Sequence, residues 1–391
     1  MDYDVTVIGA GIHGAGVAQA AAAAGHRVLV LEQYDRPARG SSSRSSKLIH
    51  GGLRYLENGQ LRLVHECLRE RALLVQNAPH LVRLLPFCIP VYPDTRRRPW
   101  KIGLGLWLYR LLGGGPFRRH GATARELLNG LRGDTLEALF CYQDAQTDDA
   151  RLTGAVLASA QQLGAEVRLG ARFVSAQLGK EGCTLVFRSG DAESRLTTRV
   201  LVNAAGPWAN EVLGGITPVQ PPTPVELIQG THIQVPGRLQ RVYYLEAPQD
   251  GRAVFVMPWR DATLIGTTET AYRGDPAAVR PLEREIDYLL AVHNHYFERR
   301  LGRGDVQDAF AGLRVLPAGD GHAFSRPRET LLVTDRRRQP RLVSLYGGKL
   351  TAYRATAEAL MRKLRPSLPR RTPVADTRRL ALPDPRQDRT P

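Results

Sequence analysis

The sequence predicts a mixed α/β protein in which a Rossmann-type domain carries an inserted domain built on an antiparallel sheet. A strand, a glycine-rich turn and a helix follow one another at the N-terminus, and similar strand–helix units return near the middle and the end of the chain. Between them, residues 216–310 contain short β-branched and aromatic runs that Pro and Gly interrupt. One sheet assembled from distant segments, with a second domain inserted between them, explains this order.

The first unit, residues 4–32, is a strand, a turn, a helix and a second strand. "DVTVIGA" and "HRVLVLE" are apolar runs typical of buried parallel strands, and an Ala-rich helix lies between them. The turn "GAGIHG" matches G-x-G-x-x-G, and Glu32 ends the second strand. In such a unit Gly9 permits the tight turn, Gly11 admits a pyrophosphate, and Gly14 lets helix and strand pack closely. We therefore expect a dinucleotide site rather than a chance glycine turn.

Two later segments favour FAD as the dinucleotide. Glu32 suits an unphosphorylated ribose, which favours FAD or NAD over NADP without choosing between them. The strand "VLVNAAGPWAN" ends in Ala205 and Gly206, which are small enough to lie beside a flat cofactor. In "SLYGGKLTAYR" a glycine pair ending at Gly348 leads into the last helix and delivers Lys349. A cation at a helix start suits a reduced, anionic flavin, although a solvated lysine is the alternative.

The remaining elements follow in order along the chain. Residues 40–57, "GSSSRSSKLIHGGLRYLE", offer hydroxyls, glycines and cations to an anionic ligand, but such stretches are more often surface loops. An amphipathic helix is expected over 61–77, and a βαβ-like segment over 151–206. Residues 340–364 read as strand, turn and helix. Beyond Pro366 the chain loses periodicity, which predicts a frayed tail.

These elements predict domains that are discontinuous in sequence. The expected ranges are 1–72, 142–215 and 308–370 for the FAD-binding domain, 73–141 and 216–307 for the substrate and membrane-proximal domain, and 371–391 for an irregular tail.

Composition narrows the class of protein. The net charge of +16 comes from 54 Lys and Arg residues, but no aromatic interleaving or zinc spacing accompanies the basic clusters, so we expect an Arg-rich solvated surface and no nucleic acid. Cys67, Cys88, Cys141 and Cys183 stand apart, which predicts four unpaired thiols and no metal site. No apolar run is long enough to span a bilayer, and the chain starts without a signal peptide, so a cytoplasmic protein is expected.

Ten segments, in their order and spacing, make the chain resemble the FAD-dependent (respiratory) glycerol-3-phosphate dehydrogenases of the D-amino-acid-oxidase-like superfamily. The most specific are "SSKLIHGGLRYLE" and "GGKLTAYR"; the former, combined with "GTHI", separates this family from amine-oxidising relatives. The others are "GAGIHGAGVA", "DDARL", "VNAAGPWAN", "GTHIQVP", "VFVMPW", "IGTTE", "GDP" and "AGLRVL". The resemblance covers residues 2–365.

The resemblance implies oxidation of sn-glycerol 3-phosphate to dihydroxyacetone phosphate with FAD as cofactor. It also implies that the electrons pass to a membrane quinone from a protein bound peripherally to an anionic membrane surface, on the cytoplasmic face of the inner membrane. Association of two copies of the chain into a homodimer is left as an open alternative.

The resemblance also assigns residues to the site. It implies an active-site Arg54–Tyr55 pair, an active-site His232 in "GTHI", a substrate-phosphate Arg314 assisted by Arg54, and Lys349 and Thr351 near flavin and substrate. The FAD-binding set it implies, together with the glycine turn, is Gly9, Gly11, Gly14, Glu32, Ser45, Ser46, Lys47, His50, Gly51, Ala205, Gly206, Gly348, Lys349 and Leu350.

Alcohol oxidation needs a base, and the chain offers two histidines for that role. A base with a pKa near neutrality suits the task, and His232 is the natural candidate, with a buried structural histidine as the alternative. His50 serves either as support for FAD or as the base. Arg suits the phosphate because its planar fork binds two oxygens at once. Tyr55 either bonds the substrate or packs beneath the loop.

The chain departs from the family pattern at two places. The family has Pro directly after the phosphate arginine, whereas here Pro317 stands two positions later. Family members also continue after "LPG" into a helical C-terminal domain, whereas this sequence stops in the matching region.

Three questions stay open at this stage. "WKIGLGLWLYRLL", residues 100–112, suits either a membrane contact or a buried element of the substrate domain. An FAD-dependent amine or 2-hydroxy-acid oxidase of the same superfamily is a rival function. A non-catalytic flavin-binding protein is another.

Overall fold

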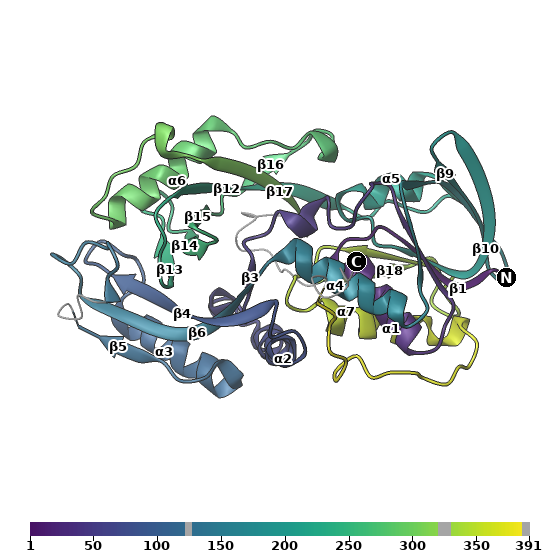
Figure 1. The fold of residues 1–391 in the computed structure, drawn as a ribbon, viewed down its shortest axis with the longest axis horizontal. Helices are drawn as coiled ribbons and strands as arrows, with labels where there is room; N and C mark the ends of the chain where they lie inside the picture. Colours follow the sequence, from purple (N-terminus) through teal and green to yellow (C-terminus); the bar gives the residue numbers. More distant parts are fainter. Residues whose placement is uncertain (122–126, 320–329, 385–391) are drawn as a thin grey trace, which may run out of the picture.

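Two sheets organise the chain, one in each lobe of the molecule (Figure 1). The computed structural model describes residues 1–121, 127–319 and 330–384. In the first lobe five parallel strands lie in the order β7-β2-β1-β10-β19, and β18 adds an antiparallel edge. Their bounds are β1 Tyr3–Ile8, β2 Val28–Glu32, β7 Glu166–Leu169, β10 Ala192–Asn203, β18 Leu331–Thr334 and β19 Leu342–Tyr346. The first half of β10 turns away to pair with β9 (Cys183–Ser189), which continues the sheet through β8 (Ala171–Leu178) and β11 (Ile216–Thr217).

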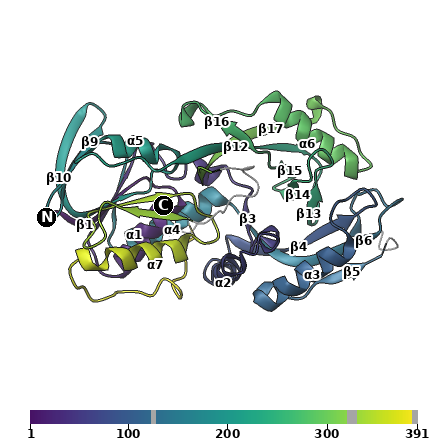
Figure 2. The same cartoon turned by 180° about the vertical axis from the view of Figure 1, so that it is seen from behind.

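Three helices cover one face of the parallel strands (Figure 2). They are α1 Ile12–Ala23, α4 Asp149–Gln162 and α7 Tyr353–Leu364. Alanines make this packing close, because α1 is buried along nearly its whole length against the other two helices. The short helix α5 (Ala209–Gly214) packs with the core on the other side of the sheet, and α2 (Leu61–Asn77) runs over the residues predicted for it.

The second sheet has a helix on each face. Its strands are β3 Leu48–Ile49, β4 Val82–Val91, β5 Arg118–His120, β6 Ala138–Thr147, β12 Val225–Pro236, β13 Val242–Glu246, β14 Ala253–Trp259, β15 Ala262–Gly266, β16 Thr270–Tyr272 and β17 Asp308–Pro317. Alternate residues serve two cores, so that Cys88 packs with α6 (Glu283–Tyr296) and Phe87 with α3 (Pro99–Tyr109). The mixed α/β prediction is confirmed; within the sheet, all pairs are antiparallel except β4 with β13, which is parallel.

Strand pairing in the two sheets differs from the expected domain division at two places. The boundary between 141 and 142 falls inside β6, all of which belongs to the second sheet. β17, expected in the FAD-binding domain, pairs along its full length with β12 of the second sheet. Sequence pattern did not reveal either crossing, because strand partners are chosen by contacts far apart in the chain.

Two further expectations need correction. Cys88 and Cys141 form a disulfide, because they lie directly opposite each other on β4 and β6 with their Cα atoms 4.3 Å apart. Cys67 and Cys183 are buried and outside any disulfide.

Residues 371–384 lack regular helix or strand but are not frayed: the Leu382 amide donates to the Asn77 carbonyl, and the Val374 amide donates to the Ala23 carbonyl. The rest of the predicted tail lies outside the described residues.

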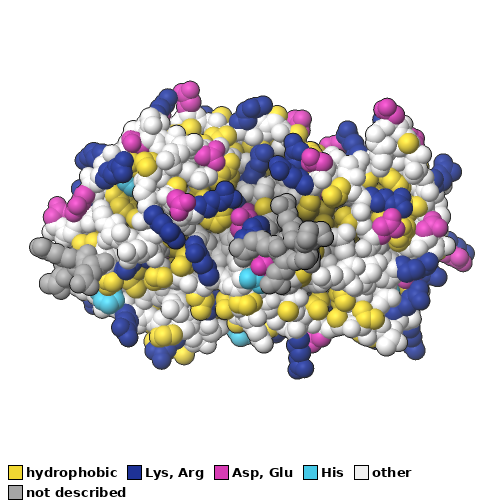
Figure 3. Space-filling view, in the orientation of Figure 1, with side chains coloured by type: hydrophobic (Ala, Val, Ile, Leu, Met, Phe, Trp, Pro, Cys, Tyr) yellow, Lys and Arg dark blue, Asp and Glu magenta, His cyan; other side chains and the backbone are white. Residues whose placement is uncertain are grey.

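Residues 100–112 were expected to form either a membrane contact or a buried element, and helix α3 has one buried and one exposed face. Ile102, Leu106 and Tyr109 are buried against the second sheet. On the opposite face Trp100, Leu104 and Trp107 are exposed by 72, 59 and 53%, and Leu111, in the helical turn Arg110–Gly114 that continues α3, is exposed by 62%. In Figures 1 and 2 α2 and α3 lie along the same lower edge of the molecule. Basic side chains are scattered over the face shown in Figure 3 and interleaved with acidic ones.

Candidate functional site

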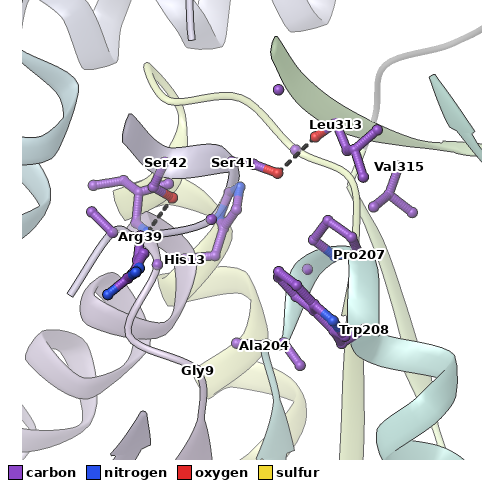
Figure 4. Close-up of a pocket in the computed structure, with 18 of the residues that line it drawn as sticks. Gly9, His13, Arg39, Ser41, Ser42, Ala204, Pro207, Trp208, Leu313 and Val315 are labelled. Atoms are coloured by element: carbon purple, nitrogen blue, oxygen red, sulfur yellow. Dashed lines mark hydrogen bonds between the residues drawn. The ribbon is translucent and has the colours of Figure 1, made fainter. Parts of the chain in front are cut away.

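A cavity of about 680 Å³ is lined by residues of both sheets. Its lining comes from the glycine turn after β1, the segment from Ala38 to His50, strands β12 and β17, and the turn before α7. Figure 4 shows Gly9 and His13 on one side of this cavity and Pro207 and Trp208 on the other. A cavity of this size is large enough for a cofactor, since such sites commonly measure about 300–1,000 Å³.

The glycine turn forms one end of the cavity. Gly9 has a φ of +98°, which favours glycine, and a Cβ on Gly14 would lie 1.8 Å from the Gly9 carbonyl oxygen. The Glu32 carboxylate accepts the amides of Ala10 (2.7 Å) and Tyr34 (3.1 Å), and burial raises its pKa. Gly9, Gly11 and Glu32 line the cavity, whereas Gly14 lies behind it and lets α1 approach β1.

The serine-rich segment is tied to the first residue of α4. The Asp149 carboxylate accepts the Ser45 hydroxyl (2.6 Å) and the Lys47 ammonium (2.6 Å), and Lys47 also donates to the Ser43 carbonyl oxygen (2.6 Å). Ser45 and Ser46 line the cavity, but Lys47 does not. The structure therefore places Lys47 as a buried support of the loop, away from the position expected for a cofactor contact.

The glycine pair after His50 is clamped from two sides. The His50 amide donates to Thr351 Oγ1 (3.2 Å), and the Gly51 amide donates to Tyr109 Oη (2.9 Å). His50 and Thr351 line the cavity, whereas Gly51 packs against Leu68 behind it. The Thr351 hydroxyl thus contacts the backbone of the loop.

Tyr55 and Lys349 meet at the edge of the cavity. The Lys349 Nζ atom lies 3.4 Å from the centre of the Tyr55 ring and 3.6 Å from the Cys67 Sγ atom. Both Tyr55 and Lys349 line the cavity. The Arg54 guanidinium also lies over the Tyr55 ring, 5.5 Å from its centre, and Arg54 itself is not among the residues that line the cavity.

Strand register brings His232 and Arg314 to one face of the second sheet. β12 and β17 are antiparallel, with His232 opposite Phe310 and Ile228 opposite Arg314. Ile228 and His232 are four residues apart on β12 and therefore share a face of the sheet, and Arg314, directly opposite Ile228, lies on that same face. Both His232 and Arg314 line the cavity. Glycines lie between them: a Cβ on Gly230 would lie 2.4 Å from the Arg314 guanidinium. Gly230 and Gly312, which lie opposite each other on β12 and β17, thus leave room between His232 and Arg314.

His232 is held neutral. Burial, together with the nearby cations of Lys47 and Arg314, lowers its pKa to about 3. A hydrogen bond of 2.9 Å joins its Nε2 atom to the Ser46 hydroxyl, and its ring stacks on Phe310. Its Nδ1 atom is buried without a hydrogen-bond partner among the described residues. This differs from the near-neutral pKa expected for a base.

Arg314 is supported by the last two residues of the "IGTTE" segment, which lie just after the end of β15. Its guanidinium donates to Glu269 (2.6 Å) and to the Thr268 carbonyl oxygen (2.8 Å). The buried Glu285 carboxylate on α6 anchors this segment, because it accepts the hydroxyls of Thr231, Thr268 and Thr270. These hydroxyl bonds offset burial and lower the pKa of Glu285. No local motif marks Glu285 for this role, because it lies on a separate helix.

The remaining expected residues, Ala205, Gly206, Gly348 and Leu350, also line the cavity. Sequence reasoning missed several others. His13 packs against the last glycine turn, where a Cβ on Gly348 would lie 2.2 Å from its Nε2 atom, and burial lowers its pKa to about 4. Tyr34 and Trp208 form an edge-to-face pair at the end of the cavity near Glu32. Tyr34 lies two residues after the end of β2 and Trp208 five residues after the end of β10, so both belong to the connections at the carboxyl ends of these strands, a placement that could have marked them.

The fold and this cavity define an FAD-dependent oxidoreductase: residues 4–354 match the FAD dependent oxidoreductase (DAO) family, and the chain belongs to it. The glycerol-3-phosphate dehydrogenase of Pseudomonas aeruginosa is 41% identical over 93% of this chain and 72% of its own length. The aerobic glycerol-3-phosphate dehydrogenase of Escherichia coli is 40% identical over 93% and 73%. The D-erythritol 1-phosphate dehydrogenase of Brucella abortus is 38% identical over 94% and 74%.

Solved structures agree with this assignment. The glycerol-3-phosphate dehydrogenase of Bacillus halodurans complexed with FAD superimposes with a TM-score of 0.76 at 28% identity, over 98% of this chain and 68% of that one. The family resemblance and the FAD prediction are therefore confirmed. The cavity fits FAD, because the glycine turn at β1 leaves no room for side chains where a pyrophosphate passes and the Glu32 carboxylate stands at the end of β2.

Within residues 1–121, 127–319 and 330–384, no helix combines the length and apolar character needed to cross a membrane. The same part of the chain contains no group of three or more His, Cys, Asp or Glu side chains placed to hold a metal ion.

Proposed function

We propose that the protein oxidises sn-glycerol 3-phosphate to dihydroxyacetone phosphate. The observation that carries the proposal is the placement of Arg314 and His232 on one face of the β12–β17 pair, inside the cavity whose other end is the glycine turn. A phosphate ligand and an alcohol proton acceptor are thus separated by a glycine-lined space. The similarity to two glycerol-3-phosphate dehydrogenases at 40% identity or more supports the same substrate.

Arg314 binds the substrate phosphate in this proposal. The guanidinium is half-buried and already oriented by Glu269 and the Thr268 carbonyl, so little entropy is lost when it binds an anion. Arg54 remains a prediction as a second phosphate ligand, since it stacks on Tyr55 at the cavity edge.

His232 accepts the alcohol proton in this proposal. Its neutral form is the one that can take a proton, and a phosphate dianion beside Arg314 raises its pKa by neutralising one of the cations that lower it. Bound FAD supplies the acceptor for the hydride that leaves the alcohol carbon. His50 is the second candidate for the proton, and Tyr55 and Lys349 offer a hydroxyl and a cation beside it.

The choice of substrate is tested by turnover with a dye as electron acceptor. We expect kcat/KM for sn-glycerol 3-phosphate to exceed that for D-erythritol 1-phosphate, glycerol and glycine. A higher kcat/KM for D-erythritol 1-phosphate would instead indicate the activity for which the Brucella abortus relative is named. Peroxide formation with glycine alone would indicate an amine oxidase.

We also propose that the electrons pass to a membrane quinone and that α3 makes the membrane contact. Trp100, Leu104, Trp107 and Leu111 form an exposed apolar stripe at helical spacing, and Arg118 and Arg119 of β5 are exposed beyond it. The buried face of α3 shares a core with Tyr55 of the cavity. A membrane-bound acceptor would therefore approach the lobe that supplies Tyr55 to the cavity.

Vesicle co-sedimentation tests this contact. We expect the protein to bind phosphatidylglycerol-containing vesicles in a salt-dependent way, because charge contributes to such binding. The double variant Trp100→Ser/Trp107→Ser should bind with an affinity at least about tenfold lower, because apolar area also drives the binding. Val219→Ser/Val374→Ser removes two other exposed apolar side chains and should bind as the unmodified protein does. Equal binding by all three proteins would remove α3 from the membrane contact.

A further inference from the structure

A tyrosine outside the cavity holds the backbone of the loop that lines it. Tyr109, the last residue of α3, accepts the Gly51 amide at its Oη atom (2.9 Å). Gly51 directly follows His50 and precedes the turn that carries Arg54 and Tyr55, residues 53–56. The loop approaches the tyrosine closely, since a Cβ on Gly51 would lie 2.6 Å from Tyr109 Oη and 2.6 Å from Leu68 Cδ2.

The orientation of the Tyr109 hydroxyl is itself fixed. It donates to Asp144 Oδ2 on β6 (2.6 Å), and the other Asp144 oxygen accepts Arg71 Nη1 of α2 (2.5 Å). Arg71 also donates to the carbonyl oxygens of Gln143 and Gly113. Each of the three side chains is buried or nearly so. With its proton committed to a carboxylate, the hydroxyl oxygen can only accept at the loop.

The loop meets a second support on its cavity side. Thr351 Oγ1 accepts the His50 amide (3.2 Å), and Thr351 belongs to the segment that brings Lys349 into the cavity. The adjacent amides of His50 and Gly51 thus have partners on opposite sides of the loop. Loss of either bond would let the segment shift relative to the last glycine turn.

We propose that Tyr109 is a positioning residue, which sets the place of His50 and Tyr55 relative to FAD through its hydrogen bond to the Gly51 amide. Tyr109 is not among the residues that line the cavity, so it acts through the backbone that it holds. The effect on turnover rests on the proposed function, but the effect on the flavin environment does not.

Tyr109→Phe tests the proposal because it deletes only the hydroxyl. Tyr142→Phe is the matched control: Tyr142 lies in the same buried core, 5.7 Å from the Tyr109 ring, and its hydroxyl makes no hydrogen bond within the described residues. With FAD-loaded protein and a dye acceptor, we expect Tyr109→Phe to lower kcat by about tenfold to a hundredfold while KM changes little, as displaced catalytic groups do. The visible absorption and circular dichroism of its flavin should also change. Tyr142→Phe should match the unmodified protein in all of these measurements.

The outcomes separate the two proposals. A Tyr109→Phe protein with unchanged kcat and flavin spectra, or with losses equal to those of Tyr142→Phe, would overturn the positioning role. If Tyr109→Phe fails to fold, Asp144→Asn keeps an acceptor for the hydroxyl while removing its charge, and it should show a smaller change of the same kind; an unaltered flavin there would likewise contradict the proposal. Failure of the unmodified protein to oxidise sn-glycerol 3-phosphate would refute the proposed function, while the flavin spectra would still test Tyr109.

Discussion

Arg314→Ala should raise the KM for sn-glycerol 3-phosphate by about a hundredfold or more and leave bound FAD in place. Removing one partner of a well-ordered, hydrogen-bonded charge pair costs about 2–5 kcal/mol, and each 1.4 kcal/mol corresponds to about tenfold in affinity. Arg314 is oriented by Glu269 and the Thr268 carbonyl toward the glycine-lined space beside His232. Steady-state kinetics with a dye acceptor measures the change.

Two companion variants sharpen this result. In Arg314→Ala the Glu269 carboxylate is left without this cation and would itself repel a phosphate. The double variant Arg314→Ala/Glu269→Gln removes that repulsion, so the loss that remains measures the missing cation. Arg314→Lys keeps the positive charge but loses the planar fork, so its KM should lie between those of the unmodified protein and of Arg314→Ala. An unchanged KM in Arg314→Ala would take Arg314 out of the phosphate site.

Gly14→Ala should yield a protein that purifies without flavin. The added Cβ would lie 1.8 Å from the Gly9 carbonyl oxygen, so helix α1 would have to move away from the turn after β1. That movement displaces the amides at the start of α1, which face the pyrophosphate in a Rossmann-type site. The ratio of flavin absorbance to protein absorbance measures the loss.

A glycine in a neighbouring helix provides the control for this substitution. Gly154 lies within α4, and a Cβ there would meet no atom within 4 Å. Gly154→Ala should keep full flavin content and gain stability, because alanine is favoured over glycine inside a helix by about 0.5–1 kcal/mol. Full flavin content in Gly14→Ala would show that the turn tolerates the displacement.

Local pattern predicted those parts of the fold that depend on neighbouring residues. The strand, turn and helix around Gly9 and the helix from Leu61 to Asn77 formed as expected, because glycine placement and apolar spacing determine them directly. The pairing of Cys88 with Cys141 and of β17 with β12 could not be predicted in this way. Those contacts join residues far apart in sequence, and neither carries a local motif.

The same distinction applies to the site. His232 and Arg314 could be chosen from their motifs, and the register of β12 with β17 then places both on the cavity wall. Lys47 could not be placed, since a lysine in a serine-rich loop reads as a ligand for an anion until Asp149, about a hundred residues later, is known to bind it. The roles of Tyr109 and Glu285 could not be predicted for the same reason. Tyr109 acts on the site through a backbone amide of another element, and Glu285 acts through threonine hydroxyls of other elements.

Anaerobic mixing of the FAD-loaded protein with sn-glycerol 3-phosphate tests the central claim most directly, because it needs no electron acceptor. The account predicts that the visible absorbance of oxidised flavin disappears in a single turnover, with dihydroxyacetone phosphate formed in an amount equal to the flavin reduced. Flavin that stays oxidised with sn-glycerol 3-phosphate, yet is reduced by dithionite, would contradict the proposed function while leaving the FAD-binding fold intact.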